Sequence, residues 1–170
     1  LVWAVRGDGA LLSCTIDRDQ QPSVLAWALH ETDGVVECVA TMPTSDSEQV
    51  WVIVRRTVDG AAVRYLERLE EDWEPWPTSY VPPEGIEAPN FGFTVDCGIA
   101  FDGAATDTFA VPHLVGKTVA ILADGAKMTP QIVPADGNVV LPRDAERVLI
   151  GLPFESRITL LTPEVQNAMG

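Results

Sequence analysis

Short runs of alternating apolar and polar residues follow one another along most of the chain. A period of two places successive side chains on opposite faces of a β-strand. In residues 62–69, for example, one face carries Val63 and Tyr65, and Glu67 continues the alternation. A 3.6-residue period sustained over ten residues is not found in the sequence, so the pattern predicts an all-β protein.

Six Asp-Gly dipeptides separate these runs. A two-residue hairpin turn of type I′ needs a positive φ at both central positions, which Asp tolerates and Gly adopts freely. Most of the dipeptides lie between apolar runs, so the chain is predicted to be a succession of antiparallel hairpins. The six are Asp8-Gly9, Asp33-Gly34, Asp59-Gly60, Asp102-Gly103, Asp124-Gly125 and Asp136-Gly137.

Residues 1–71 contain a repeat, because the first three Asp-Gly dipeptides are 25 and 26 residues apart. Strand pairs are expected around the second and third dipeptides, joined by residues 42–47. Together they form four-stranded antiparallel units, as in the blades of a β-propeller, although a sandwich would give the same pattern. The expected strands are 24–30, 35–40, 50–56 and 62–69.

A proline-rich linker is expected at residues 72–90. Five of the thirteen prolines fall in residues 73–90, and proline cannot donate to a strand ladder. Beyond it, residues 91–170 are expected to form a small antiparallel β-barrel or sandwich domain. Its expected strands are 94–100, 118–123, 131–133, 138–141, 147–151 and 157–161.

The chain is strongly acidic, with a formal net charge of −14. Acidic residues outnumber basic ones twelve to six in residues 1–71, four to none in 72–90 and nine to five in 91–170, so the excess is not a tail. Tight binding of nucleic acid is not expected, because affinity for phosphates comes from Lys and Arg. The charge suits solubility, or a surface that DNA must pass without sticking. No apolar stretch approaches the ~18–20 residues that cross a bilayer.

Cysteines and histidines give no pattern for a metal or a cofactor. Cys14, Cys38 and Cys97 form no C-x-x-C pair, and their odd number argues against a complete disulfide framework. His30 and His113 are far apart in the sequence, so no zinc pattern results. We expect three buried, reduced thiols and neither a metal nor a cofactor.

No catalytic residues are predicted. A Gly-x-Ser-x-Gly elbow and a glycine-rich phosphate loop are missing, and neither histidine has a recognisable Ser or Cys partner motif. His113 is expected to pack or to form a hydrogen bond. Pairs of carboxylates for glycoside hydrolysis stay open, because their separation is invisible in sequence. We expect no enzymatic activity.

Two short acidic motifs are interpreted as turns. Arg6-Gly7-Asp8 matches an integrin-recognition tripeptide, but Asp8 already belongs to an expected hairpin turn. Asp17-Arg18-Asp19 lacks the remainder of a calcium-binding loop.

Tryptophans recur in step with the turns. Trp3, Trp27 and Trp51 are spaced by 24 residues, which favours equivalent core positions in successive repeats over the stacking of sugars. Trp27 and Trp51 are therefore expected to be largely buried. Trp73 and Trp76 fall in the linker.

Several motifs occur in a fixed order along most of the chain. The first segment contains Trp3-x-x-Arg6-x-Asp8-Gly9-x-Leu11-Leu12, Ala26-Trp27-x-x-His30-x-x-x-Gly34, Val50-Trp51-x-x-Val54-Arg55-Arg56-Thr57-x-x-Gly60 and Arg64-Tyr65-Leu66-Glu67-Arg68-Leu69. The second contains Asp96-Cys97-Gly98-x-x-Phe101-Asp102-Gly103, His113-Leu114-x-Gly116-x-x-Val119, Leu122-Ala123-Asp124-Gly125 and Gly151-Leu152-Pro153-Phe154-x-Ser156. In this order they resemble the tail nozzle (tail tubular B-type) proteins of short-tailed bacteriophages. The second segment also resembles a small barrel module named after ubiquitin-activating enzymes, from which no ubiquitin chemistry is inferred.

The resemblance implies a structural protein of the virion tail, assembled in the host cytoplasm. It implies a ring of identical subunits around the channel through which DNA leaves, in contact with adaptor and tail fibre proteins. DNA would pass without specific binding. The family has no catalytic residues, and its members are much longer, so we expect a segment of a longer protein.

A different class of function stays open. A carbohydrate-binding or glycan-cleaving module of a phage adhesin or secreted enzyme would also be acidic and rich in β-structure. A line of exposed tryptophans beside a pair of carboxylates would favour it, and buried tryptophans would favour the structural role.

Overall fold

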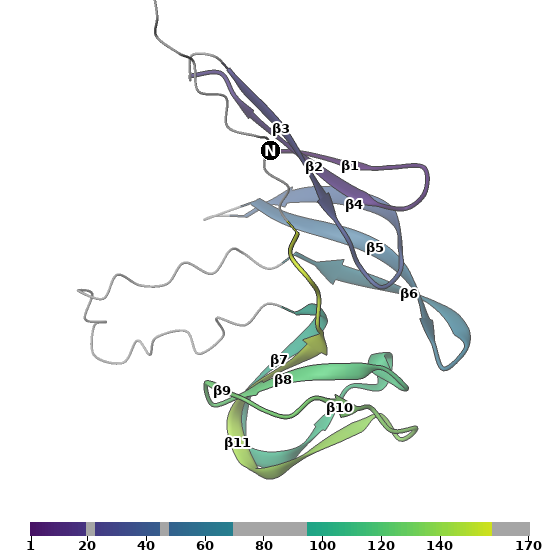
Figure 1. Cartoon of the computed structure of the whole chain (residues 1–170), viewed down its shortest axis with the longest axis vertical. Helices are drawn as coiled ribbons and strands as arrows, with labels where there is room; N and C mark the ends of the chain where they lie inside the picture. Colours follow the sequence, from purple (N-terminus) through teal and green to yellow (C-terminus); the bar gives the residue numbers. More distant parts are fainter. Residues whose placement is uncertain (20–22, 45–47, 70–94, 158–170) are drawn as a thin grey trace, which may run out of the picture.

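The computed structural model describes residues 1–19, 23–44, 48–69 and 95–157. Within these ranges the chain is all-β and antiparallel, as predicted, and falls into two units (Figure 1). The first unit consists of β1 (Val2–Val5), β2 (Leu11–Asp17), β3 (Val24–His30), β4 (Val35–Pro43), β5 (Glu48–Val58) and β6 (Ala61–Arg68). The second consists of β7 (Asp96–Ala110), the short 3-10 helix η1 (Pro112–Leu114), β8 (Thr118–Ala123), β9 (Ala126–Lys127), β10 (Gln131–Ile132) and β11 (Asn138–Leu152).

Two three-stranded sheets make up the first unit. The sheet β1-β2-β3 packs with one face on the sheet β4-β5-β6, and a shared core of buried apolar side chains lies between them. The amide of Val36 at the start of β4 donates to the carbonyl of Gly9, which joins the two sheets at one edge. The buried residues of this core are Leu11, Val36, Val52 and Val54.

The second unit has the larger core of the two. Its strands are ordered β10-β8-β11-β7, with β9 paired to β8, and the two 15-residue strands β7 and β11 pair along nearly their whole length. Alternate residues of β8 and β11, including Val119, Ile121, Val148 and Ile150, are about 1% exposed or less. The sheet therefore encloses an apolar interior.

Two Asp-Gly dipeptides form the predicted type I′ hairpin turns. Asp59-Gly60 joins β5 to β6 with φ values of 47° and 76°, and Asp124-Gly125 joins β8 to β9 with 47° and 74°. Asp8-Gly9 also lies in a hairpin, between β1 and β2, but only Gly9 has a positive φ. Asp136-Gly137 closes a turn in which the Gly137 amide donates to Pro134, just before β11.

The prediction of a hairpin at Asp33-Gly34 is wrong. Neither residue has a positive φ, and β3 pairs with β2 while β4 pairs with β5, so the dipeptide connects two different sheets. A Cβ built on Gly34 would lie 2.9 Å from a side-chain atom of Val54 and 3.0 Å from the carbonyl oxygen of Arg55. Glycine is therefore required here by close approach, not by turn geometry.

Asp102-Gly103 was also predicted to be a turn and is not one. Both residues lie inside β7, where Asp102 is the register partner of Arg147 on β11. The Arg147 guanidinium reaches the Asp102 carboxylate at 3.5 Å across the pair. A cross-strand ion pair thus takes the place of the expected break.

The predicted four-stranded units regroup into three-stranded sheets, because β3 joins β2. Neither a propeller nor a closed barrel is found in the part of the chain that the structure describes. The predicted strands 138–141 and 147–151 are parts of the single strand β11, which is irregular between Val140 and Arg147. The predicted linker 72–90 and most of the predicted strand 157–161 lie outside the described residues, as do Trp73 and Trp76.

Candidate functional site

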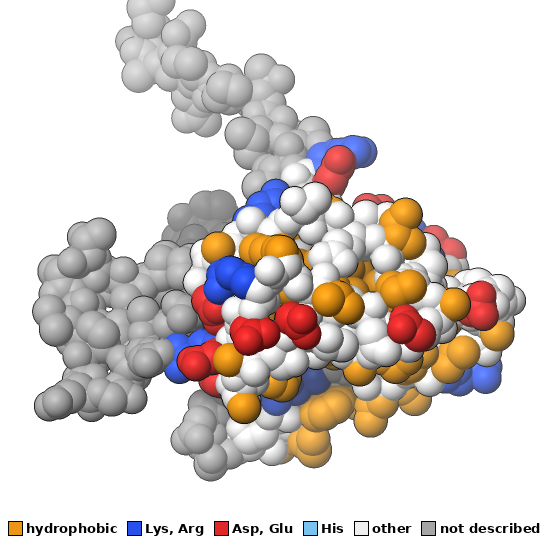
Figure 2. Space-filling view, turned by 90° about the horizontal axis from the view of Figure 1, so that it is seen from below, with side chains coloured by type: hydrophobic (Ala, Val, Ile, Leu, Met, Phe, Trp, Pro, Cys, Tyr) orange, Lys and Arg blue, Asp and Glu red, His pale blue; other side chains and the backbone are white. Residues whose placement is uncertain are grey.

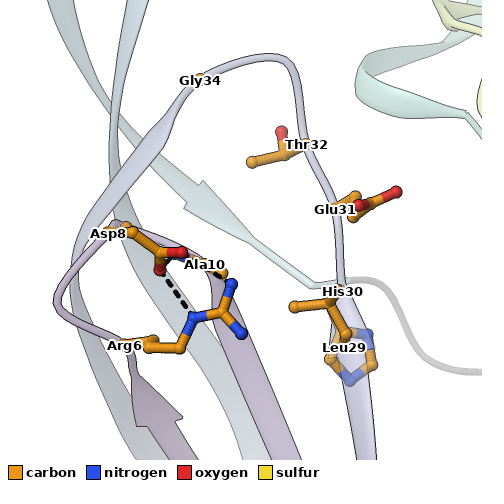
Figure 3. Close-up of a pocket in the computed structure, with 9 residues that line it drawn as sticks. Arg6, Asp8, Ala10, Leu29, His30, Glu31, Thr32 and Gly34 are labelled. Carbon is orange, nitrogen blue, oxygen red and sulfur yellow. Dashed lines mark hydrogen bonds and ion pairs between the residues drawn. The ribbon is translucent and has the colours of Figure 1, made fainter.

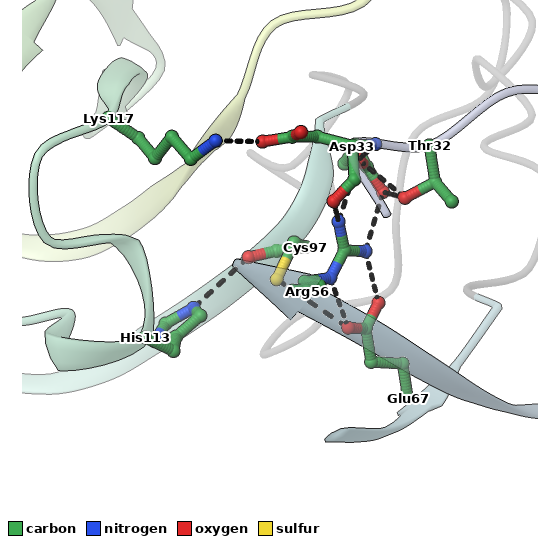
Figure 4. A network of polar contacts seen from close by, with 8 residues as sticks. Thr32, Asp33, Arg56, Glu67, Cys97, His113 and Lys117 are labelled. Atoms are coloured by element: carbon green, nitrogen blue, oxygen red, sulfur yellow. Dashed lines mark hydrogen bonds and ion pairs between the residues drawn. The ribbon is translucent and has the colours of Figure 1, made fainter. Parts of the chain in front are cut away.

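A buried arginine lies where the two units meet (Figure 4). Arg56 occupies an inward-facing position near the end of β5, where its side chain is 3% exposed. Around it lie Glu67 from β6, Asp96 from the start of β7, and Thr32 and Asp33 from the connection between β3 and β4. We call these five residues the Arg56 cluster.

Every N–H of the Arg56 guanidinium has an acceptor. Nε and Nη2 donate to the two carboxylate oxygens of Glu67 at 2.6 and 2.7 Å, and Nη1 donates to the Asp33 carbonyl at 2.7 Å. Nη1 and Nη2 each donate a second hydrogen bond, to the two carboxylate oxygens of Asp96, with N–O distances of 3.3 and 3.2 Å. These bidentate contacts give all five N–H groups of the buried guanidinium a hydrogen-bond acceptor.

Asp96 also ties the connection between β3 and β4 to the second unit. Its carboxylate accepts from the Thr32 hydroxyl at 2.8 and 2.9 Å and from the Asp33 amide at 3.1 Å. Beside it, Lys117 of the second unit pairs with the Asp33 carboxylate at 2.6 Å. The cluster therefore joins three separate chain segments.

The ionisation of these groups follows from their surroundings. Although burial in itself lowers the pKa of Arg56, hydrogen bonding to Glu67 and the charge of Asp96 raise it above its usual value. Burial raises the pKa of the Cys97 thiol to about 12 despite the opposing charge of Arg56, and Glu67 and Asp96 add to the rise. Cys97 is thus a neutral thiol that donates to Glu67 at 3.6 Å, not a nucleophile.

His113 has the hydrogen-bonding role that the sequence predicted. Its Nε2 lies 3.1 Å from the Cys97 carbonyl, and its ring meets the edge of Tyr65 at 6.2 Å. Because a carbonyl can only accept, Nε2 carries the proton. This hydrogen bond from His113 therefore helps to hold the backbone of Cys97, which has a positive φ of 50°.

An open hollow of about 430 Å³ lies between the β1–β2 turn and the end of β3 (Figure 3). The Arg6 guanidinium binds the Asp8 carboxylate there at 2.6 and 2.8 Å, and Glu31 points away from this pair. Arg6 and Asp8 thus bind each other within the β1–β2 turn, in agreement with the interpretation of Arg6-Gly7-Asp8 as part of a turn.

The pairing of β2 with β3 brings His30, which lines the hollow, close to a hydroxyl that the sequence did not indicate. Ser13 Oγ lies 2.8 Å from His30 Nε2, and the Trp3 ring lies tilted against the same imidazole with 5.1 Å between the ring centroids. Burial lowers the pKa of His30, so the imidazole is neutral at pH 7. Ser13 is buried and does not line the hollow, so this pair contributes to packing and presents no nucleophile to a substrate.

Replacing Arg6 by Gln is expected to raise the pKa of Asp8 from about 2 toward its ordinary value, ~3.9, while the Ala10 amide still holds it somewhat below that value. Hydrogen bonding to Arg6 is the largest cause of the lowered pKa, followed by the Ala10 amide. A lowered carboxylate pKa stabilises the fold above the pKa of the unfolded chain, and this contribution is lost as the pH falls through the folded value. Carboxyl chemical shifts in an NMR titration measure the pKa. Arg143→Gln, which removes the partner of Asp124, is the control and leaves Asp8 unchanged.

One face of the sheet β1-β2-β3 is apolar and exposed. Leu25, Trp27 and Leu29 alternate along β3 and are 67%, 59% and 47% exposed. Ile16 on β2 lies opposite Leu25 in register and is 47% exposed. We call these four residues the β3 strip.

The β3 strip corrects the prediction for tryptophan. Trp27 was expected to be largely buried and equivalent to Trp51, but it projects from the outer face of β3. Trp51 is half-buried on the other sheet, where its Nε1 donates to Gln49, and Trp3 packs against the core. The spacing of 24 residues does not give equivalent positions, because one sheet ends and the next begins between Trp27 and Trp51.

The cysteines are free, and their burial differs from the prediction. Cys14 is buried, Cys97 is half-buried, and Cys38 is exposed on β4, so the expectation of three buried thiols fails for Cys38. Among the described residues, no group of three or more His, Cys, Asp and Glu side chains is placed to hold a metal ion. In the same ranges no helix is long and apolar enough to span a membrane.

No protein-family model matches the chain, and no curated protein sequence matches it.

Proposed function

We propose that the protein is a structural subunit of a bacteriophage tail, part of a nozzle-type ring around the DNA exit channel. The ordered motifs that resemble tail nozzle proteins suggest this role, and the all-β architecture agrees with it. In this proposal the two packed sheets are propeller-like repeats, and the second unit is the small barrel module.

The observation that carries the proposal is the β3 strip on an edge strand. Among the described residues β3 pairs only with β2, so its outer edge offers backbone groups that no described strand pairs. Proteins usually protect such an edge with charged residues or proline, and residues 24–29 contain neither. A long, uncharged, apolar edge strand is suited to pairing with another strand.

The occupant that we propose for this edge is β3 of a second copy. Copies with a net charge of −14 repel each other over most of their surface, so contact is favoured where charge is absent. Neither residues 24–29 nor residues 11–16 beside them contain Asp, Glu, Lys or Arg. Antiparallel pairing about Trp27 would place Trp27 opposite its counterpart and Leu25 opposite Leu29 of the other copy. This two-fold contact joins subunits in pairs, so in this proposal the ring is built from such pairs through further contacts.

Trp27→Glu is expected to abolish self-association, because it places a charge at the centre of this contact in each copy. The measurement is the molar mass by sedimentation velocity across a concentration series. Leu66→Glu is the matched control, because Leu66 is 67% exposed on the edge strand β6 of the other sheet. A wild-type protein that stays monomeric at every concentration, or a Trp27→Glu variant that associates normally, would contradict the proposed contact.

DNA is expected to pass this protein without sticking. On the face shown in Figure 2, acidic side chains occur at several separate places among apolar, neutral and basic ones. Like charges repel DNA phosphates within a Debye length, about 8 Å at physiological salt. In a gel-shift titration the protein should bind duplex DNA no better than a neutral control protein. Sub-micromolar, salt-sensitive binding of duplex DNA would contradict the proposal that DNA passes this protein without binding to it.

Exposure of the Trp27 ring also favours a second candidate, the carbohydrate-binding module. A flat aromatic face stacks on sugar rings as well as on another protein. The line of exposed tryptophans that this function requires is not found among the described residues, because Trp3 and Trp51 are half-buried. Binding to a glycan array that Trp27→Ala abolishes would favour this candidate over the structural role.

A further inference from the structure

The two units touch over a small, polar junction. All the extensive strand-to-strand contacts of the described residues lie within one unit or the other, and none joins β1–β6 to β7–β11. Among the described residues, the contacts that cross include those of the Arg56 cluster, the Cys97 thiol with Glu67, Lys117 with Asp33, and His113 with Tyr65. The position of the second unit on the first therefore depends on this junction.

We propose that the Arg56 cluster is a latch that holds the second unit in one orientation on the first, and that neutralising both Glu67 and Asp96 opens it. The latch is independent of the tail function proposed above, because it rests only on the geometry of the junction.

The charge balance of the cluster makes the opening a two-step event. The Arg56 guanidinium faces the carboxylates of Glu67 and Asp96, so these three side chains together carry one excess negative charge. Neutralising one carboxylate leaves one cation against one anion, and the buried guanidinium still has a charged partner. Neutralising the second leaves Arg56 buried without an anion, which is strongly unfavourable.

Neighbouring groups cannot replace the lost anions. The Asp33 carboxylate is engaged by Lys117 at 2.6 Å, and the Cys97 thiol stays neutral because burial raises its pKa to about 12. His113 donates to a carbonyl whether its ring is neutral or charged. The titratable and charged groups that face Arg56 or line the junction are Asp33, Tyr65, Glu67, Asp96, Cys97, His113 and Lys117.

Loss of Asp96 charge acts directly on the second unit. Asp96 is the first residue of β7, and its two oxygens accept from Arg56, from the Thr32 hydroxyl and from the Asp33 amide. An asparagine there keeps one acceptor oxygen and adds an NH₂ group that faces donors. Glu67→Gln does the same on the β6 side, within the first unit. The two substitutions therefore mimic protonation at the two sides of the junction.

Chemical cross-linking of Lys117 to Asp33 reports the closed latch. A carbodiimide activates a carboxylate so that an amine in contact with it forms an amide bond. Lys117 Nζ and Asp33 Oδ2 lie 2.6 Å apart and belong to different units. The cross-linked peptide is quantified by mass spectrometry at neutral pH in the full chain. Circular dichroism verifies that the strands persist, and small-angle X-ray scattering gives the radius of gyration.

We expect Glu67→Gln and Asp96→Asn to cross-link within about two-fold of wild type, and the double variant to lose about ten-fold or more, with a larger radius of gyration. Glu37→Gln is the matched control, because Glu37 bridges Arg55 and Arg64 on the exposed face of the same strands. A double variant that cross-links like wild type and stays as compact would overturn the latch. A single variant that opens completely would overturn the two-step balance.

If the double variant does not fold, acid titration of the wild-type protein tests whether neutralising the carboxylates opens the latch. Reversible expansion in scattering, at a pH where circular dichroism still shows the strands, is the expected result. A protein that stays equally compact until its strands are lost has no latch of this kind.

Discussion

Replacing Arg56 by Met should lower the free energy of unfolding by about 3–5 kcal/mol, because it leaves Glu67 and Asp96 facing each other without a counter-charge. Both carboxylates are only 20% exposed, so water cannot replace the five hydrogen bonds of the guanidinium. Methionine fills most of the volume, and the loss therefore reflects the unpaired charges more than a cavity. Urea denaturation followed by tryptophan fluorescence measures the change.

Arg64→Met is the control for this experiment. Arg64 lies on β6 and pairs with Glu37 at 2.7 Å, but its side chain is 67% exposed. Exposed pairs of this kind contribute little to stability, because solvent screens them. Equal losses in the two variants would show that burial of Arg56 has no energetic consequence, contrary to the structure.

Substituting Gly137 by Ala is expected to cost about 2–4 kcal/mol through two additive effects. Gly137 has a φ of 75°, where a Cβ costs about 1–2 kcal/mol. The new Cβ would also lie 2.9 Å from Pro112 Cα, and backbone atoms cannot move aside cheaply. The Gly137 carbonyl accepts from Val111 at 2.7 Å, so a shift would break the link between this turn and η1.

Gly60→Ala separates the two effects. Gly60 has nearly the same φ, 76°, but a Cβ there would meet nothing within 4 Å. Its cost should be limited to the backbone effect, about 1–2 kcal/mol. If Gly137→Ala and Gly60→Ala destabilise equally, the close approach to Pro112 plays no part.

The sequence predicts strands well and their partners poorly. Alternation is local, so the fold class and the hairpins at Asp59-Gly60 and Asp124-Gly125 follow from it. Pairing between strands depends on which faces share a core, and Asp33-Gly34 has the same letters as a hairpin turn. Only the packing of Gly34 against Val54 distinguishes a crossover between sheets from a turn.

The Arg56 cluster had a signal in the sequence that could have been used. Val52, Val54 and Arg56 alternate on β5, which places a charged residue on the apolar face, and Glu67 continues the inward face of β6. An arginine at such a position demands a buried acid. Asp96 could not be found in this way, because it is 40 residues further along the chain and reaches Arg56 only where the two units meet.

The antiparallel pairing of β7 with β11 determines how the second unit would respond to tension along the chain. Asp96 at the start of β7 is the register partner of Leu152 at the end of β11, so the unit is entered and left at the same end of this ribbon. A pull on the two ends would separate the strands one hydrogen bond at a time, like a zipper, and would not shear them all together. The first bonds to meet the force are at Asp96, where Arg56 and Thr32 also hold the carboxylate. Mechanical resistance of the second unit should therefore depend on the first.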